Sequence, residues 1–278
     1  MDFIPRIPIY KWTDSAIEFT QIRWGSSFDA FSSFMKDMIE GLQNGLIAIP
    51  PALFILIVAL IAWRLVNKKI AIFAIVGLLL IDNMNLWVPT METLAMVIGA
   101  VFWCIVLGVP LGILAAKSAA AHRIITPILD FMQTLPAFVY LLPAVTFFHL
   151  GVVPAIIATL IFAMPPVIRL TDLGIKSVPL ELVELGKSFG STFWQMMIKI
   201  ELPVARPTIM AGINQCIMLS LSMVVVAAMI GAKGLGGEVW RAIQRLDSGN
   251  GFEAGLALVI IAIVLDRITQ SFGSKKYE

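Results

Sequence analysis

Charged residues are scarce in this chain of 278 residues, of which 14% are charged and 59% are apolar. Soluble domains average about 25% charged and about 45–50% apolar residues. Together with a mean hydropathy of +0.92, these fractions exclude a water-soluble globule and predict an integral membrane protein. The 20 basic and 18 acidic side chains nearly cancel, which excludes the broad positive field that attracts nucleic acid.

Histidine and cysteine are rarer still, with two residues of each. His122 and His149 have no partner motif for catalysis, and Cys104 and Cys216 lie in apolar stretches without metal-ligand spacing. The chain also lacks a serine-hydrolase elbow and a pair of carboxylates within an apolar stretch. We therefore expect no catalytic residue, no metal site and two buried, inert thiols.

Glycine is present, but not in nucleotide-binding patterns. Residues 186–188, Gly-Lys-Ser, resemble the end of a phosphate-binding loop, yet Glu181 occupies the position where that motif requires glycine. The glycines within 231–237 miss the dinucleotide pattern and predict a flexible turn on the outer side. The chain is therefore not expected to hydrolyse ATP by itself.

Long apolar runs are abundant, and a transmembrane helix needs about 20 mostly apolar residues. Residues 1–45 lack the pattern of a cleavable signal peptide, so membrane insertion is expected to depend on these runs. The sequence predicts an all-α integral membrane protein with about seven transmembrane helices, the second of them short. The seven segments are residues 46–66, 70–88, 91–116, 124–148, 151–171, 207–231 and 252–270.

The distribution of Lys and Arg predicts the orientation, because loops on the cytoplasmic side carry an excess of both. The polar stretch 172–206 lies between the fifth and sixth predicted spans. If this stretch is cytoplasmic, most basic side chains fall on its side, among them Lys117, Arg169, Lys275 and Lys276. The sequence thus predicts a multi-pass protein with its N-terminus outside and its C-terminus inside.

The N-terminal segment 1–45 is too polar to span a bilayer. Within it, residues 25–45 repeat apolar side chains at helical spacing, which predicts an amphipathic helix in the membrane interface. Few basic side chains line its polar face, so we expect anchoring or packing on the outer surface rather than recognition of anionic lipid. The apolar stripe is Phe28, Phe31, Met35, Met38 and Leu42.

Prolines occur at six places in the predicted spans. A broken helix in lipid must hide its free backbone groups in protein or in a wet cavity, so six breaks favour a translocation pathway. An alternative is that proline is simply common in membrane helices. The prolines are Pro50 and Pro51, Pro110, Pro136, Pro143, Pro154, and Pro165 and Pro166.

The polar stretch after the fifth span predicts two short helices. Ser177 is the expected N-cap of the first helix, with Pro179 in its opening turn and Gly190 at its end. Ser191 is the expected N-cap of the second helix, which should stop before Pro203. This stretch is therefore expected to form a docking element on the cytoplasmic side.

Five positions in this stretch share the spacing of a known motif, and they are Glu184, Gly190, Ile200, Leu202 and Pro203. With them the stretch resembles the EAA loop of permeases of binding-protein-dependent ABC importers, although other residues replace the two alanines. The resemblance implies a coupling helix that fits a groove on a separate ATPase subunit, with apolar anchors. The implied coupling residues are Glu184, Leu185, Gly186, Phe189, Gly190 and Pro203.

Stretches 133–143, 161–169, 211–215, 221–225 and 265–270 extend the resemblance across residues 90–272. They are similar to the glycine betaine/proline betaine permeases. The resemblance implies a subunit of a bacterial cell membrane that moves a quaternary-amine solute inward. This chain would bind no cofactor, because ATP and Mg belong to partner ABC ATPase subunits. The other implied partners are a separate extracellular substrate-binding protein and a second permease copy, as a homodimer or a pair of permeases.

The expected organisation has four parts. Residues 1–45 form the extracellular or interfacial segment, and residues 46–88 form two accessory transmembrane helices. Residues 89–272 form the permease core with the coupling loop 172–206, and residues 273–278 form a cytoplasmic tail.

A betaine combines a quaternary cation with a carboxylate, so its path needs aromatic faces and hydrogen-bond donors. Weak contacts are expected there, because a site that binds tightly releases slowly. As an alternative, the same side chains could pack within the bundle or join helices by hydrogen bonds. The candidates for the path are Gln133, Phe138, Tyr140, Asn214, Gln215 and Ser222.

Two alternative functions stay open. Within the same class, choline, carnitine or another small solute could be the substrate. An ion-driven secondary transporter would use an ionisable residue inside a span, and Asp130 is the candidate, although it lies near the start of its span. Arg169, Asp172, Asp266 and Arg267 lie at predicted cytoplasmic ends, where ion pairing and anchoring are expected.

Overall fold

The structure is a computed structural model that describes residues 9–273, and every regular element in that range is helical. This confirms the all-α prediction, while the predicted tail 273–278 lies outside the described residues beyond its first residue. The elements are α1 (Ile9–Ala48), α2 (Pro51–Leu65), α3 (Lys68–Asn83), α4 (Trp87–Lys117), α5 (Ala119–Thr134), α6 (Ala137–Phe148), α7 (Val152–Lys176), α8 (Leu180–Ser188), α9 (Phe193–Met196), the π-helix η1 (Met197–Glu201), α10 (Leu202–Ala228), α11 (Leu235–Arg245) and α12 (Ser248–Gly273).

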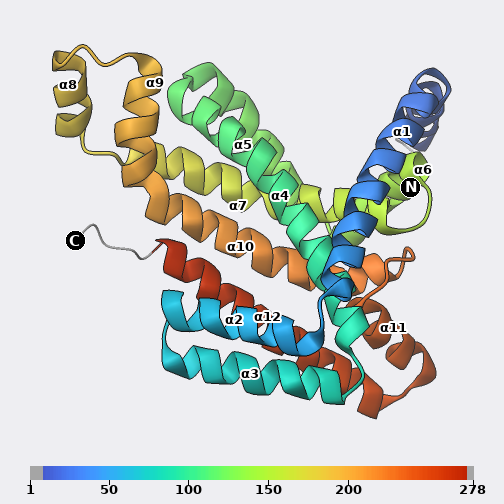
Figure 1. Ribbon diagram of the computed structural model, residues 1–278. Helices are drawn as coiled ribbons and strands as arrows, with labels where there is room; N and C mark the ends of the chain where they lie inside the picture. Colours follow the sequence, from blue (N-terminus) through green and yellow to red (C-terminus); the bar gives the residue numbers. More distant parts are fainter. Residues whose placement is uncertain (1–8, 274–278) are drawn as a thin grey trace, which may run out of the picture.

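Helix α7 packs against both α4 and α10, and these three helices supply much of the core (Figure 1). Glycines bring them close. A Cβ added at Gly112 of α4 would lie 2.5 Å from Thr171 Cβ and 2.8 Å from the Ile168 carbonyl oxygen of α7. A Cβ at Gly212 of α10 would lie 3.0 Å from the Pro166 carbonyl oxygen of α7. In lipid, such close approach of small residues is a main source of helix association.

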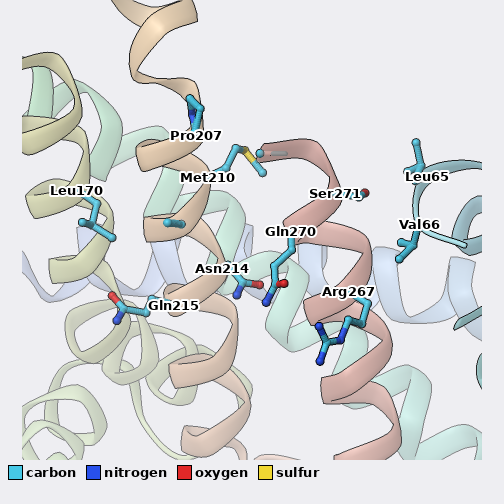
Figure 2. A pocket seen from close by; sticks show the side chains of 12 residues that line it. Leu65, Val66, Leu170, Pro207, Met210, Asn214, Gln215, Arg267, Gln270 and Ser271 are labelled. Atoms are coloured by element: carbon cyan, nitrogen blue, oxygen red, sulfur yellow. The ribbon is translucent and has the colours of Figure 1, made fainter. Parts of the chain in front are cut away.

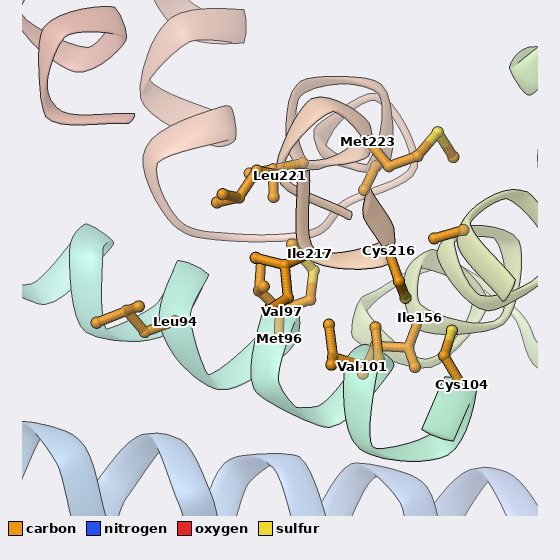
Figure 3. Close-up of a cluster of buried hydrophobic side chains, with 14 of the residues drawn as sticks. Leu94, Met96, Val97, Val101, Cys104, Ile156, Cys216, Ile217, Leu221 and Met223 are labelled. Atoms are coloured by element: carbon orange, nitrogen blue, oxygen red, sulfur yellow. The ribbon is translucent and has the colours of Figure 1, made fainter. Parts of the chain in front are cut away.

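The rest of this core is filled by apolar side chains of the same three helices, which Figure 3 shows converging from α4, α7 and α10. Cys104 and Cys216 are both fully buried there as free thiols, as the sequence predicts. Gly108 and Gly112 both face α7 and lie four residues apart. This is the small-residue spacing of closely packed membrane helices, and the two glycines form the α4 side of the contact with α7.

Three helices are long and apolar enough to cross a membrane by themselves, namely α4, α7 and the continuous helical run Phe193–Ala228 that contains α10. Predicted spans 91–116, 151–171 and most of 207–231 fall within them. Two further pairs qualify if each bent pair is one span, with bends of 98° between α1 and α2 and 102° between α5 and α6. By length and composition, the described residues therefore contain three to five spans.

Only two of the six proline sites interrupt a helix. Pro50 separates α1 from α2, and Pro136 divides the predicted span 124–148 into α5 and α6. Leu135 is extended, with φ −71° and ψ 136°, because proline disfavours the helical region for the residue before it. Pro154 lies in the first turn of α7, and the remaining prolines lie at or inside helices that continue. The expectation of six breaks is wrong, because surrounding helices let a helix continue through proline.

The N-terminal helix is longer than the 25–45 segment that the sequence predicts. Helix α1 has 40 residues and extends to Ala48, because no proline lies between Pro8 and Pro50. Its first half is largely exposed, whereas Met35 and Ile39 are buried, with Ile39 lying against Gly99 of α4. Part of the predicted apolar stripe therefore packs on the bundle.

The turn predicted at 231–237 is compact and leads directly into α11. Gly234 has φ +102°, and the Leu235 N–H donates to Thr93 Oγ1 at 2.8 Å. A Cβ at Gly236 would lie 2.3 Å from the Val224 carbonyl oxygen. The prediction of a flexible turn is wrong, because these glycines serve close packing rather than freedom of the backbone.

We predict that Gly112→Ala loosens α4 from α7. The added methyl group meets both a side chain and a backbone carbonyl, and overpacking of this kind costs about 1–3 kcal/mol. Gly255→Ala in α12 is the matched control, because its surroundings are open and alanine is better than glycine inside a helix by about 0.5–1 kcal/mol. Thermal unfolding in detergent, followed by tryptophan fluorescence, should show a lower midpoint for Gly112→Ala alone. Equal midpoints would contradict the close packing.

Candidate functional site

One segment stands away from the bundle and is here called the docking segment, residues 180–201 (Figure 1, upper left). It consists of α8, α9 and η1, and α8 packs chiefly on the other two. A Cβ at Gly186 would lie 2.6 Å from Met196 Cε and 2.8 Å from Ile200 Cδ1. Glycine at this position therefore lets α8 lie close against the start of the long helix.

The caps of the docking segment differ from the prediction. Ser177 is the C-cap of α7 rather than the N-cap of α8. Pro179 is the N-cap of α8, and its carbonyl accepts from the N–H groups of Leu182 and Val183. Thr192, one residue after Ser191, caps α9. The Gln195 N–H donates to the Thr192 side chain, and the Thr192 N–H donates to the Gln195 side chain, which together form a capping box. Ser191 lies one residue too early in the chain to form it.

The second helix does not stop before Pro203. The chain continues through the π-helix η1 into α10, and Pro203 is the second residue of α10. At this point the Leu202 N–H donates to the carbonyl of Met197, five residues earlier. Because the wider π turn already displaces the α-helical hydrogen bonds, proline fits here without a backbone N–H. The predicted helix end is wrong, and the docking segment is instead continuous with a membrane-spanning helix.

Gly190 ends α8 as the sequence predicts. Its φ is +73°, a left-handed conformation that suits glycine. The Gly190 N–H donates to the Lys187 carbonyl at 2.9 Å, and the Ser191 N–H donates to the Gly186 carbonyl at 3.1 Å. This pair of bonds is a Schellman motif, and it turns the chain sharply between α8 and α9.

Large apolar side chains cover the outside of the docking segment, and we call them the docking surface. Phe189 is 81% exposed and Leu185 is 54% exposed. Glu184 is exposed beside them. Leu182, Leu185 and Phe189 share one face of α8 by their spacing, and exposed apolar groups of this kind mark a site of interaction with another molecule. The docking surface consists of Leu182, Leu185, Phe189, Phe193 and Trp194.

A half-buried ion pair, with Glu201 buried and the Lys117 side chain 32% exposed, connects the docking segment to α4. Lys117 Nζ, at the last residue of α4, lies 2.6 Å from Glu201 Oε1, at the last residue of η1. Glu201 is only 2% exposed, and its other oxygen has no hydrogen-bond partner among the described residues. Removing Lys117 would leave the buried Glu201 carboxylate without its charged partner, which destabilises a structure. The pair is therefore a strong structural connection, which the motif spacing did not reveal.

A cavity of about 700 Å³ lies between α10, α12 and the α2–α3 turn. It brings together Asn214 and Gln215 with Arg267 and Gln270, and Figure 2 shows Asn214 and Gln270 near one another between the two helices. The amides of Asn214 and Gln270 both donate to Asp266 Oδ1 at 2.7 Å. The hydrogen bond from Asn214 joins α10 to α12, while Gln215 is exposed.

The other four candidates for a pathway lie elsewhere. Gln133 and Phe138 are exposed at the α5–α6 bend, with Phe138 53% exposed. Tyr140 is buried, and its hydroxyl donates to the Met132 carbonyl across the bend. Ser222 is exposed on α10, seven residues after Gln215 and therefore on the same face. The structure thus places the candidates in two groups, one at the bend and one along α10.

The charged residues near α5 and α7 form ion pairs. The Arg169 guanidinium pairs with Asp130, and Asp172 lies 2.7 Å from Lys176 Nζ and 3.1 Å from His122 Nδ1. The pairs made by Arg169 and His122 connect α5 to α7. Asp130 is therefore neutralised by a neighbour rather than isolated. No group of three or more His, Cys, Asp or Glu side chains suited to a metal ion occurs among residues 9–273.

Together, the long apolar helices, the cavity between α10 and α12 and the exposed docking surface are features of a membrane protein with a surface for another molecule. Residues 108–273 match the family described as binding-protein-dependent transport system inner membrane component, and this chain belongs to that family.

Two curated relatives extend the similarity over nearly the whole chain. The chain is 51% identical over 276 residues to the glycine betaine transport system permease protein OpuAB of Bacillus subtilis, covering 99% of this chain and 98% of the relative. It is 49% identical over 281 residues to the glycine betaine/carnitine transport permease protein GbuB of Listeria monocytogenes, covering 99% of both. The similarity to glycine betaine permeases predicted from the sequence is thereby confirmed.

A solved structure shares the fold of the core. An inward-facing conformation of the MetNI methionine ABC transporter aligns with a TM-score of 0.60 and 22% identity, covering 65% of this chain and 93% of that chain. About a third of the chain therefore lies outside the shared fold.

We predict that Gly190→Pro disrupts the turn between α8 and α9. Proline can neither adopt a positive φ nor donate to the Lys187 carbonyl. Gly190→Asn is the control, because asparagine tolerates the left-handed conformation and open space surrounds the position. Copurification of a tagged ATPase subunit should fall about tenfold for proline, the factor expected from a loss of about 1.4 kcal/mol, and stay near the wild-type level for asparagine. Equal retention of the subunit by both variants would contradict a role for this turn.

Proposed function

We propose that this chain is the membrane-spanning subunit of an importer for glycine betaine and related quaternary-amine compatible solutes in a bacterial cell membrane, driven by ATP hydrolysed on partner subunits. One observation carries the substrate class. The chain is 51% and 49% identical, over nearly its whole length, to two permeases named for glycine betaine. The chain itself is non-catalytic in this proposal.

The docking surface supports coupling to an ABC ATPase subunit. Leu185 and Phe189 are exposed apolar anchors that a groove on the ATPase would bury, and Glu184 is an exposed charge at their edge. The shape of the segment comes from Gly186, which allows close packing, and from Gly190, which makes the turn. ATP and Mg would stay on the partner, and this chain would hold no cofactor.

The proposed topology has seven spans, formed by α2, α3, α4, the bent pair α5–α6, α7, α10 and α12. The docking segment, the α2–α3 turn and the end of α12 lie at one end of the bundle, at the left in Figure 1. Lys68, Lys69 and Lys117 lie at that same end, so an excess of basic side chains supports its assignment to the cytoplasm. The N-terminus would then be outside, with α1 in the outer interface and residues 46–88 as accessory helices.

A path for the solute is proposed along the exposed face of α10. Gln215 and Ser222 share this face, and Ala211 and Met218 are exposed between and beside them. A second permease copy facing α10 would enclose it, and an extracellular substrate-binding protein would deliver the solute. Phe138, exposed at the α5–α6 bend, offers an aromatic face for the quaternary cation. Asn214 and Tyr140 are engaged in hydrogen bonds and would shape the path rather than contact the solute.

Carnitine is the second candidate substrate, because GbuB is named for both glycine betaine and carnitine, and choline shares the quaternary cation. An ion-driven secondary transporter is disfavoured. Its candidate carboxylate, Asp130, is paired with Arg169, and the chain belongs to a family named for binding-protein-dependent transport.

Uptake into proteoliposomes tests the proposed function. The vesicles contain this chain, its cognate ATPase and its binding protein, and labelled glycine betaine is supplied outside with or without ATP inside. We expect ATP-dependent uptake that unlabelled betaines suppress more strongly than choline, carnitine or proline. Uptake by this chain alone along an ion gradient, or ATP-dependent uptake of carnitine but not of betaine, would contradict the proposal.

We predict that Phe189→Ser weakens binding of the ATPase subunit. Burial of a phenylalanine side chain contributes about 2 kcal/mol, so its loss should lower affinity about 30-fold. Phe252→Ser is the matched control, because Phe252 is exposed to a similar extent, 73% against 81% for Phe189, but lies near the start of α12, away from the docking segment. Affinity is measured by titrating labelled ATPase subunit onto the permease in nanodiscs. If Phe252→Ser weakens binding as much as Phe189→Ser does, the docking surface is not the interface.

A further inference from the structure

A half-buried ion pair, Lys117–Glu201, connects the docking segment to α4. Among the ion pairs of residues 9–273, the Lys117–Glu201 pair is the one that joins residues 180–201 to another helix of the bundle. The charged groups on the outer part of the segment, Glu181, Glu184, Lys187 and Lys199, are exposed. Glu201 differs from these groups, because its side chain is only 3% exposed and it lies where the segment meets the bundle.

Because of its position at the end of α4, Lys117 can pass a movement of the docking segment to the whole helix. Lys117 is the last residue of α4, where a cation is also stabilised by the helix dipole. Helix α4 has 31 residues and runs from this end of the bundle to Trp87 at the other. It is held against α7 through Gly108 and Gly112. A displacement of its last turn would therefore move α4 and α7 together.

Glu201 is the last residue of the π-helix η1, where the docking segment joins α10. The docking segment is joined covalently to α10 through η1, but a π turn is a local irregularity that can bend. Covalent continuity would move α10 and, through the close contact at Gly212, α7, but it gives no direct link to α4. The ion pair adds a link to α4, so that movement of the docking segment reaches both helices that flank α7.

We propose that the Lys117–Glu201 ion pair carries movement of the docking segment to α4, and that both residues are positioning residues for energy coupling. This inference rests on the proposed function. Neither residue touches the solute or ATP. Their role is to keep α4 and the docking segment moving as one unit, so that closure of the ATPase subunits changes access at the far end of α4.

The first test measures transport per ATP. Lys117→Met and Glu201→Gln neutralise one partner each while keeping a side chain of similar length. In the reconstituted importer, each should lower solute taken up per ATP hydrolysed at least about tenfold, while the ATPase subunit stays bound and active. Lys69→Met, which removes an exposed lysine at the same end of the bundle, should leave the ratio unchanged. The reversed pair, Lys117→Glu with Glu201→Lys, should restore the ratio to within about threefold of the wild type.

The second test needs no transported solute. A cysteine introduced at Val88, which is 48% exposed at the far end of α4, is labelled with a membrane-impermeant thiol reagent with and without ATP. The native thiols are buried and should react slowly. ATP should change the labelling rate of Val88→Cys in the otherwise native chain and should not change it when Lys117→Met is added. This readout separates failure of the ion-pair role from failure of the assigned substrate.

Three results would overturn the proposal. An unchanged transport ratio in Lys117→Met and Glu201→Gln would show that the pair is dispensable for coupling. Loss of the bound ATPase subunit in these variants, with no rescue by the reversed pair, would show a role in assembly or stability alone. An ATP-dependent labelling rate at Val88→Cys that persists in Lys117→Met would show that α4 moves without the pair.

Discussion

Close backbone contact between α7 and its two neighbours is the constraint on which the rest of the structure depends. Apolar side chains alone do not hold helices together in lipid, because lipid tails solvate them equally well. Gly112 and Gly212 remove the side chains that would separate α7 from α4 and α10. The resulting three-helix core determines where the ends of α4 and α10 lie. The docking segment and the Lys117–Glu201 pair lie at those ends, and the cavity between α10 and α12 lies beside the first turns of α10.

Continuity of one long helix connects the docking segment to the candidate pathway. The helical run Phe193–Ala228 has 36 residues and therefore extends about 54 Å. Phe193 and Trp194 of the docking surface lie at its start, and Gln215 and Ser222 lie on its exposed face. The π-helix η1 lies between these two groups and accommodates Pro203. In the proposed function, a single element would bear both the contact with the ATPase subunit and the surface that faces the solute. This arrangement suits a subunit that converts movement at one end into access along its length.

The docking segment was predictable from sequence because its signals are local. The spacing of Glu184, Gly190 and Pro203 identified it, and the left-handed Gly190 follows from the absence of a side chain. The predicted N-cap of α9 was one residue off, because Ser191 and Thr192 can both cap a helix. The reciprocal hydrogen bonds between Thr192 and Gln195 make Thr192 the cap. The number of helix breaks predicted from the prolines was too high, since a helix in a bundle continues through most of these sites.

By itself, the amino-acid sequence determined that this is an all-helical membrane protein of the permease family, because composition, apolar run length and motif spacing are properties of the chain. Only the tertiary structure decided which polar residues meet. Lys117 and Glu201 are 84 residues apart, and Asn214 and Asp266 are 52 apart. Such contacts depend on how helices far apart in the chain pack, and glycine contacts of a few ångströms determine that packing.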